Sequence, residues 1–472
     1  MKRVILVVLT VFGLLQIACY KDKGNYDYHM PVTPTINLDS VYHVFIGDTL
    51  IIDPKVTTTD PNARFSYSWK ISITGEFRDT TFTGNVLNMV FGLKPQLYSA
   101  RLTVTDSSNG MKYFHSFMID GQTQFSTGAL VLSVEGNVSQ LSFVKPDSTV
   151  MPRIYRAIHG TDLPGGAQQV LMLVDQHINT LPVLGYWITG TETNDAGVEL
   201  DPNTLLTIKT LRYNFFDPPA SAVPGNFDAS ADGVLQGVVN GRLYSGSTYT
   251  FYGSDVYGMF GVYPDGDYQL YRRLALNSVA PYALGYDVNR KQFVAFTNFG
   301  SFAYVGTDYQ VTDITAFDPK NAGLDLVHFQ QPNGTNCYAF GKSADGTLYE
   351  VKFGAAFMGF IQLSPIYKRV FPQPSLITAT TKWAGTSDEV FYFNSGDKVY
   401  RYNPSNQDIR PLTTDFGGKA VSMVKLTDND NTLIAGVDGT VYFLDISPGK
   451  TGNIIKRFDG IPGAPVDVVV RQ

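Results

Sequence analysis

The feature that most constrains the fold of this chain is a hairpin unit that recurs through about its last 350 residues. Each copy has an apolar strand, a turn that usually contains Asn-Gly or Asp-Gly, and a second strand that often carries Leu-Tyr or Val-Tyr. These dipeptides supply the positive φ angles of a tight hairpin turn. The clear copies lie at residues 238–244, 265–271, 338–351, 390–402 and 433–444, and weaker copies lie at 130–143 and 291–305.

The spacing of the copies predicts a β-propeller. The turn glycines Gly300, Gly346, Gly396 and Gly439 are 46, 50 and 43 residues apart. A period of 40 to 50 residues with two central strands per copy is typical of propeller blades. At about 50 residues per blade, residues 122–472 hold seven blades, although the closely spaced turns at Gly241 and Gly266 leave eight open. Sustained 3.6-residue periodicity is missing, which excludes a helical solenoid.

Composition supports an all-β chain. The 28 Tyr, 31 Phe and 44 Gly among 472 residues, with only 17% charged residues, suit many short strands joined by tight turns. The same composition argues against a coiled coil and against disorder. A formal net charge of −6 lacks the basic surface of a nucleic-acid-binding protein.

Residues 35–121 predict a separate β-sandwich. Phe65, Tyr67 and Trp69 alternate along one strand and share one face. Six or seven short strands in about 85 residues are typical of an immunoglobulin-like sandwich. The Tyr-x-Trp strand and the Leu-Thr-Val-Thr-Asp ending at residues 102–106 resemble a PKD domain. We therefore expect Trp69 to be the core tryptophan between the two sheets.

The N-terminal segment predicts export and lipidation. Lys2 and Arg3 precede a stretch of about a dozen mostly apolar residues, which is too short to span a bilayer and has the length of a signal peptide. Gln16-Ile17-Ala18-Cys19 resembles a lipobox. We expect residues 1–18 to be removed, Cys19 to be acylated, and residues 19–34 to form a tether; an ordinary secretory signal with an incidental cysteine is the alternative. The remaining cysteine, Cys337, is expected to be a buried small hydrophobe.

The sequence from Cys19 to Tyr28, Cys-Tyr-Lys-Asp-Lys-Gly-Asn-Tyr-Asp-Tyr, resembles the mature N-terminus of the PKD-like lipoprotein family. The resemblance implies an outer-membrane lipoprotein exposed on the cell surface. It also implies work beside a TonB-dependent transporter and its lipoprotein lid, in a Sus-like uptake system whose cargo is a glycan or a peptide. The family offers no catalytic motif to carry over.

Catalytic and metal motifs are scarce in the chain. None of the six histidines forms a close metal-ligand pair, and glutamate occurs only at residues 76, 135, 192, 199, 350 and 389. The run at residues 428–431 lacks the glycine and distal glutamate of a calcium loop. We therefore predict a non-catalytic binding or accessory protein without cofactor or metal. A surface glycoside hydrolase or polysaccharide lyase is the alternative.

Two segments carry the candidate ligand-binding residues. Residues 190–232 form the longest stretch without the repeat, and long loops are often functional. Their aromatic cluster, with Arg212, Tyr213, Phe215 and Phe216, is predicted either to bind a ligand or to form the core of the loop. Trp383 either packs between blades or offers its ring to a sugar or peptide.

Overall fold

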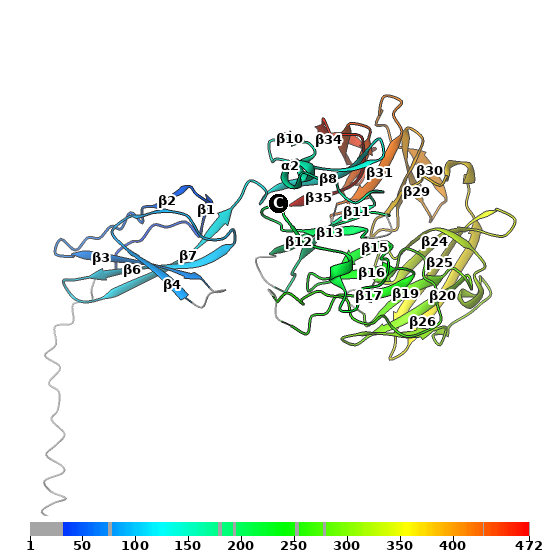
Figure 1. The fold of residues 1–472 in the computed structure, drawn as a ribbon, viewed down its shortest axis with the longest axis horizontal. Helices are drawn as coiled ribbons and strands as arrows, with labels where there is room; N and C mark the ends of the chain where they lie inside the picture. Colours follow the sequence, from blue (N-terminus) through cyan, green and yellow to red (C-terminus); the bar gives the residue numbers. More distant parts are fainter. Residues whose placement is uncertain are drawn as a thin grey trace, which may run out of the picture. The chain divides into compact units, whose positions relative to one another are not determined.

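The computed structural model describes residues 32–73, 78–177, 182–191, 195–250, 254–276, 280–427 and 429–471. With 51% strand and 4% helix, it confirms the all-β prediction. The chain divides into two compact units, residues 1–121 and 122–472 (Figure 1). The lipobox and the decapeptide from Cys19 to Tyr28 lie outside the described residues.

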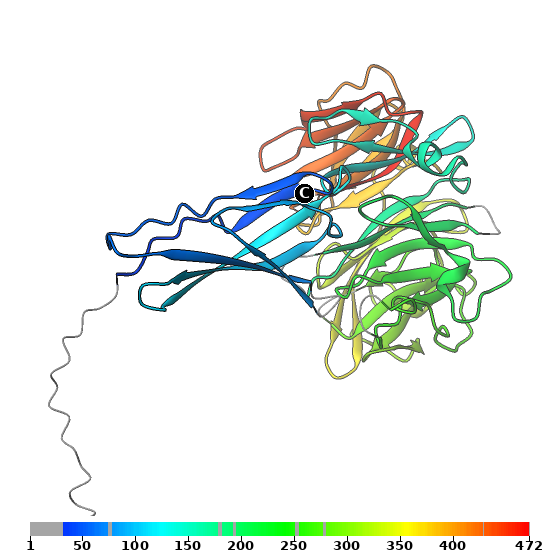
Figure 2. The same cartoon turned by 60° about the vertical axis from the view of Figure 1, so that its left-hand side comes forward.

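The N-terminal unit has two sheets (Figure 1, Figure 2). The larger has the strand order β1-β7-β6-β3-β4, and β2 pairs with β5 in the smaller one. The strands are β1 (Val41–Phe45), β2 (Thr49–Ile52), β3 (Phe65–Ile73), β4 (Arg78–Thr83), β5 (Leu87–Val90), β6 (Leu97–Asp106) and β7 (Lys112–Gln122).

Alternation in β3 and β6 builds the core of this unit. Trp69 is fully buried, its indole Nε1 donates to the carbonyl of Gly84 at 2.9 Å, and Phe117 meets its ring edge to face. The prediction that Trp69 is a core residue is therefore confirmed.

Seven separate sheets make up the described part of residues 122–471. Apart from the last strand of the chain, the strands of the first three sheets lie in about the first third of the unit. The first sheet contains β10 (Val150–Met151), β9 (Val138–Val144), β8 (Gly128–Glu135) and β35 (Ala464–Arg471). The second contains β11 (Gln169–Val174), β12 (Val183–Thr189), β13 (Gly197–Leu200) and β14 (Thr207–Thr210). The third contains β15 (Pro224–Ala229), β16 (Leu235–Val239) and β17 (Arg242–Ser245).

The other four sheets follow in chain order. The fourth contains β18 (Ala275–Leu276), β19 (Tyr282–Asp287), β20 (Gln292–Asn298) and β21 (Phe302–Gly306). The fifth contains β22 (Gln310–Val311), β26 (Ile361–Val370), β25 (Leu348–Phe357), β24 (Asn336–Lys342) and β23 (Asp325–Gln330). The sixth contains β27 (Trp383–Gly385), β28 (Phe391–Ser395), β29 (Lys398–Asn403) and β30 (Asp408–Pro411), and the seventh β31 (Val421–Leu426), β32 (Thr432–Val437), β33 (Thr440–Asp445) and β34 (Asn453–Asp459). The short helices are α2 (Ile154–His159), η3 (Arg212–Asn214), η4 (Pro319–Asn321) and η5 (Pro374–Leu376).

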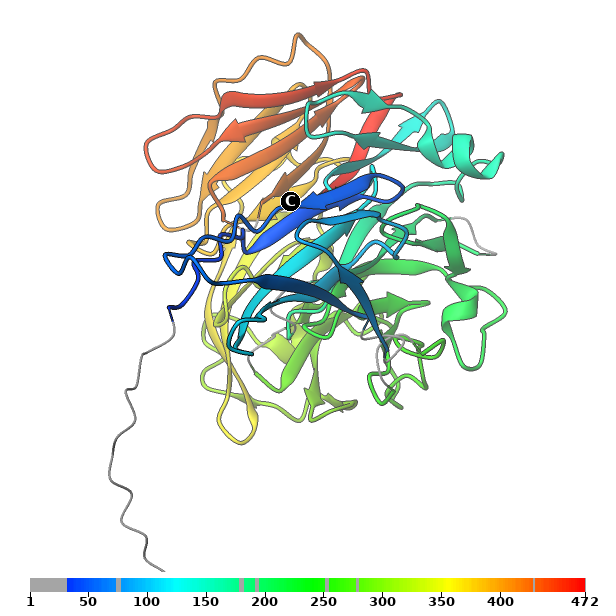
Figure 3. The same ribbon diagram turned by 90° about the vertical axis from the view of Figure 1, so that its left-hand side faces the viewer.

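The two ends of this unit meet in one sheet. β35 pairs antiparallel with β8, so the last strand of the chain completes the first sheet, and in Figure 3 the red strand lies against the cyan ones. The Asp467 carboxylate of β35 accepts from the backbone N–H of Val170 in β11 at 3.0 Å and from Lys425 Nζ in β31 at 2.7 Å. This one side chain therefore joins the first sheet to the second and to the seventh.

Most of the predicted hairpins are confirmed. The turn between β16 and β17 has Asn240 at φ 52° and Gly241 at φ 73°, as a tight hairpin turn requires. The hairpins around Gly136, Gly300, Gly346, Gly396 and Gly439 also form.

Two expectations about the repeat are wrong. Residues 265–271 form no hairpin: Leu270 makes an isolated bridge to Asp287, and Tyr268 and Leu270 pack into the core of the fourth sheet. Residues 190–232 are not one long loop, because β13, β14 and β15 lie within them. The four-residue strands β13 and β14 are too short to give a clear alternating pattern.

Candidate functional site

The predicted aromatic cluster divides between surface and core. Tyr213, in η3, is 72% exposed and Phe216 is 55% exposed, whereas Phe215 is 3% exposed and packs against Tyr244 and Phe260. Arg212 Nε donates to the carbonyl of Pro219 at 3.2 Å, which fixes the segment locally. Tyr213 and Phe216 therefore have rings open to solvent, and Phe215 does not.

Trp383 lies at the start of β27 rather than in a loop, and it is buried. Its ring stacks on Phe340 at 4.5 Å between centroids and on His328 at 5.5 Å. Trp383 therefore packs between sheets, which is the first of the two possibilities that the sequence offers. Neither Trp383 nor Phe215 has a ring face open to a ligand.

A larger candidate site lies in the C-terminal unit, beside strands of its third, fourth and fifth sheets. A cavity of about 730 Å³, here called the inner cavity, opens between the ends of β15, β18 and β23. Its lining is mostly polar and comes from strands of three different sheets and from the loops beside them, so distant parts of the sequence meet there. The polar side chains include Asp228, Gln236, Arg273, Asn298, Gln330 and Gln331.

The inner cavity holds two opposite charges that are not paired with each other. Solvent reaches the Asp228 carboxyl, but the protein around it removes hydration and so raises its pKa, an effect that Arg273 and Lys425 oppose. Within the described ranges, neither Asp228 nor Arg273 has an ion-pair partner within 4.0 Å. Both groups are therefore available to a ligand in the cavity.

Beside the cavity, His328 is buried in β23 and its imidazole is neutral at physiological pH. Burial lowers its pKa to about 3, and the positive charge of Arg273 contributes. Gln330 exchanges two hydrogen bonds with the backbone of Gly385, at 3.1 and 3.2 Å, which fixes its amide to the sixth sheet. Gln331 differs, because its buried Oε1 has no hydrogen-bond partner in the described structure.

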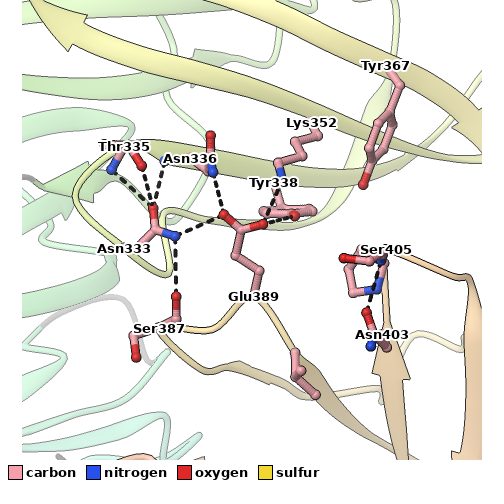
Figure 4. Close-up of polar contacts among 12 residues, drawn as sticks. Asn333, Thr335, Asn336, Tyr338, Lys352, Tyr367, Ser387, Glu389, Asn403 and Ser405 are labelled. Carbon is pink, nitrogen blue, oxygen red and sulfur yellow. Dashed lines mark hydrogen bonds and ion pairs between the residues drawn. The ribbon is translucent and has the colours of Figure 1, made fainter.

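A second polar cluster, around Glu389, ties the fifth sheet to the sixth (Figure 4). Lys352 Nζ and the Tyr338 hydroxyl donate to Glu389 Oε2 at 2.6 and 2.7 Å. Asn333 Nδ2 donates to Oε1 at 2.9 Å, and Asn336 donates to the same oxygen. Because these donors occupy both oxygens, the cluster holds the loop before β28 and has no free carboxylate for chemistry.

Glu389 should make stability depend on pH. Burial alone would raise its pKa, but the hydrogen bonds, led by that from Lys352, lower it to about 2. A depressed folded-state pKa stabilises the fold above the unfolded value of 4.5, and this stability is lost as the pH falls from about 4.5 towards about 2. We expect the contribution to be about 1 to 3 kcal/mol. Urea unfolding at pH 7 and pH 3 measures it, and in Glu389→Gln the difference between the two pH values should shrink by that amount.

Asp228 and Arg273 could not be identified from the sequence. Aspartates are frequent in turns for local reasons, so Asp228 carries no signal of its own. Arg273 lies 45 positions further on, before β18, and only the folded chain places both residues in the lining of one cavity.

Comparisons with known proteins bear mainly on the fold. Residues 19–166 match the model of the PKD-like family, which covers the N-terminal unit and continues through β8, β9, β10 and α2. A search of curated protein sequences found no match. Similar solved structures are β-propeller-like proteins.

Three of these structures illustrate the level of similarity. A quinonprotein alcohol dehydrogenase-like protein from Bacteroides thetaiotaomicron is 14% identical over 93% of this chain and 99% of its own, with a TM-score of 0.44. A dihydro-heme d1 dehydrogenase is 12% identical over 79% of this chain and 73% of its own, with a TM-score of 0.38. A functionally unknown protein from Desulfotomaculum acetoxidans is 11% identical over 73% of this chain and 99% of its own, with a TM-score of 0.42.

Within the described ranges, no helix is both long and apolar enough to cross a bilayer. The same residues contain no group of three or more histidine, cysteine, aspartate or glutamate side chains placed to hold a metal ion.

Proposed function

We propose that this chain is a non-catalytic binding protein whose C-terminal unit is a seven-bladed β-propeller, one blade for each of the seven sheets. The inner cavity is its ligand site, and the ligand is a glycan. Peptide recognition depends on apolar anchor pockets or an open sheet edge. The inner cavity instead offers amide, carboxylate and guanidinium groups from several sheets, which suit the hydroxyl groups of a sugar chain.

The observation that carries this proposal is that Asp228 and Arg273 line one cavity and that neither has an ion-pair partner within 4.0 Å among the residues that the structure describes. A charged group that is partly desolvated and unpaired is costly. A ligand that donates hydroxyl hydrogens to Asp228 and accepts from Arg273 relieves that cost with charge-assisted hydrogen bonds. The partnerless Oε1 of Gln331 adds a further acceptor for a ligand hydroxyl.

The setting that we propose is the outer surface of a Gram-negative outer membrane. The lipobox at Cys19 and the decapeptide support a lipid anchor, and the match to the PKD-like family supports a spacer unit between anchor and propeller. In this setting the protein acts as an accessory component of a Sus-like uptake system, beside a TonB-dependent transporter and its lipoprotein lid.

The binding proposal predicts a large effect of small changes in the inner cavity. An oligosaccharide array identifies the ligand, and calorimetry measures its affinity for Asp228→Asn and Arg273→Gln. Loss of a hydrogen bond to a charged group should weaken binding about 10- to 100-fold. Asp438→Asn, in the exposed turn between β32 and β33, is the control and should bind normally. Equal affinity for all three variants, or binding only to a peptide array, would contradict the proposal.

The proposed lipid anchor at Cys19 predicts that loss of this cysteine moves the protein out of the membrane fraction. Cys19→Ala removes the thiol that accepts the diacylglycerol, so labelled palmitate should no longer be incorporated and the protein should leave the membrane fraction. A single acyl chain binds membranes only marginally, whereas two or three hold a protein firmly. Wild-type protein that takes up no palmitate would show that the segment is an ordinary secretory signal.

A surface glycosidase is the second candidate, because Asp228 and Asp232 both line the inner cavity and the pKa of Asp228 is raised, as a general acid requires. Binding without hydrolysis is favoured over a glycosidase. The Asp232 carboxylate, which would be the second catalytic acid, lies 3.2 Å from His177 Nε2 and is 46% exposed. Asp228→Asn separates the two functions. Hydrolysis of the identified glycan by wild-type protein, lost in this variant, would establish the enzyme.

A further inference from the structure

A second cavity, here called the side cavity, lies between the second and third sheets. It measures about 430 Å³ and is bordered by Trp187, Glu199, Lys209, Tyr213, Leu235 and Tyr257. Residues 233–235 form part of its wall, and residues 228–232 immediately before them line the inner cavity. One short segment therefore separates the two cavities.

Strand register places the charged groups of the side cavity in one row. Leu171 in β11 lies opposite Trp187 in β12, Trp187 opposite Glu199 in β13, and Glu199 opposite Lys209 in β14. Directly opposite residues in antiparallel strands point to the same face of a sheet. The row therefore changes from apolar to charged as it crosses the sheet towards the outer strand β14.

The charged end of the row is only partly satisfied. Lys209 Nζ lies 3.5 Å from Glu199 Oε2, and these side chains are only 18% and 12% exposed. Lys209 is the only hydrogen-bond or ion-pair partner of Glu199 in the parts of the chain with described positions. Burial raises the pKa of Glu199, and Lys209 opposes this only in part. The carboxylate and the ammonium thus retain free acceptor and donor positions beside each other.

A glycine makes room for this carboxylate. A Cβ at Gly185 in β12 would lie 2.9 Å from Glu199 Oε1, closer than such contacts occur. The backbone of Gly185 is not in the left-handed region, so the residue is needed here for space. Alanine at this position would push the carboxylate away while leaving its charge in place.

Tyr213 completes the side cavity with an aromatic surface. It is 72% exposed at the start of the segment that follows β14, and it is a lining residue. Phe216, three residues later, is 55% exposed but does not line the cavity. The chain therefore offers one exposed aromatic inside the site and a matched one outside it.

We propose that the side cavity is a separate subsite for a single pyranose ring. Two neighbouring hydroxyl groups bind there, one donating to Glu199 and the other accepting from Lys209, and the C–H face of the ring lies on Tyr213. The inference rests on the proposed function for its ligand class, but it uses none of the residues of the inner cavity. An adjacent donor and acceptor against an aromatic ring match a vicinal diol on a flat apolar face.

The test uses the full chain and four defined probes. Methyl α-D-glucopyranoside, methyl α-D-mannopyranoside, methyl β-D-galactopyranoside and permethylated methyl glucoside are titrated while ligand-observed NMR is recorded. At least one free glycoside should bind, and the permethylated one should not, because it has no hydroxyl to donate. Affinity should fall at least about fivefold in Tyr213→Ala. Glu199→Gln and Gly185→Ala should also weaken binding, and Phe216→Ala, outside the cavity, should leave it unchanged.

Thermal melting checks that each variant is folded. Because Tyr213 is exposed, the Tm of Tyr213→Ala should lie within about 2 °C of that of the wild type. The proposal is overturned if none of the three glycosides binds, if the permethylated sugar binds equally well, or if Tyr213→Ala and Glu199→Gln bind normally. Oligosaccharide binding that depends on Asp228, together with any of these results, would overturn the proposed subsite in the side cavity but not the proposed ligand site in the inner cavity. Glycoside binding that depends on Tyr213, without an effect of Asp228→Asn on the binding of any glycan, would instead overturn the proposed ligand site in the inner cavity.

Discussion

Replacing Glu350 with alanine should lower the free energy of unfolding of the C-terminal unit by about 3 to 5 kcal/mol. The Glu350 side chain in β25 is completely buried, and its carboxylate pairs with Arg369 Nε at 3.0 Å. It also accepts from the hydroxyl groups of Tyr367, at 2.7 Å, and Tyr402, which lies in the neighbouring sixth sheet. Removing the carboxylate leaves a largely buried guanidinium, the buried Tyr402 hydroxyl and the half-buried Tyr367 hydroxyl without this acceptor.

An exposed ion pair provides the control for this measurement. Glu135 in β8 pairs with Arg153, and these side chains are 40% and 46% exposed. Glu135→Ala should cost no more than about 1 kcal/mol, because water screens and replaces the interaction. Guanidinium unfolding of both variants gives the comparison, and a Glu350→Ala loss as small as that of Glu135→Ala would mean that the buried network adds little.

Ending the chain at Gly460 should prevent the C-terminal unit from folding cooperatively. This change removes β35, with buried Ile461 and Val468, and with Asp467, which holds three sheets together. It also leaves the edge of β8 unpaired, and an open apolar edge favours aggregation. Circular dichroism should show no sharp thermal transition, and size-exclusion chromatography should show aggregates.

Two further experiments test whether this effect is specific to β35. A synthetic peptide of residues 461–472, added during refolding, should restore part of the transition by re-forming the β8–β35 pair. Val470→Thr, at a 38% exposed position of β35, should unfold within about 0.5 kcal/mol of wild type. A shortened chain that melts like wild type would show that the first sheet is complete without its last strand.

The sequence predicts the fold best where local chemistry alone determines it. Asn240-Gly241 and Asp345-Gly346 specify hairpin turns by themselves, and the alternation around Trp69 specifies a half-buried strand. Asp265-Gly266 carries the same turn signal without forming a hairpin, because Tyr268 and Leu270 gain more by packing into the fourth sheet. A turn dipeptide thus indicates a hairpin only when the flanking residues remain free to pair.

The candidate sites are harder to predict, because they depend on residues far apart in the sequence. The sequence left open whether Trp383 packs or binds, because the residues that cover its ring, Phe340 and His328, come from the neighbouring fifth sheet. Tyr213 could be identified because it belongs to an aromatic cluster in a segment that lacks the repeat. Glu199 and Lys209 could not, because only the strand register makes these residues neighbours.

The pairing of β35 with β8 also sets an order of events in biosynthesis. Arg471 Nη1 reaches the carbonyl of Phe125 across 346 positions of the chain, so the first sheet stays incomplete until β35 has left the ribosome. Contacts of such long range are formed late and slowly. The same strand pairing that stabilises the finished unit therefore delays completion of its first sheet until almost the whole unit has been synthesised.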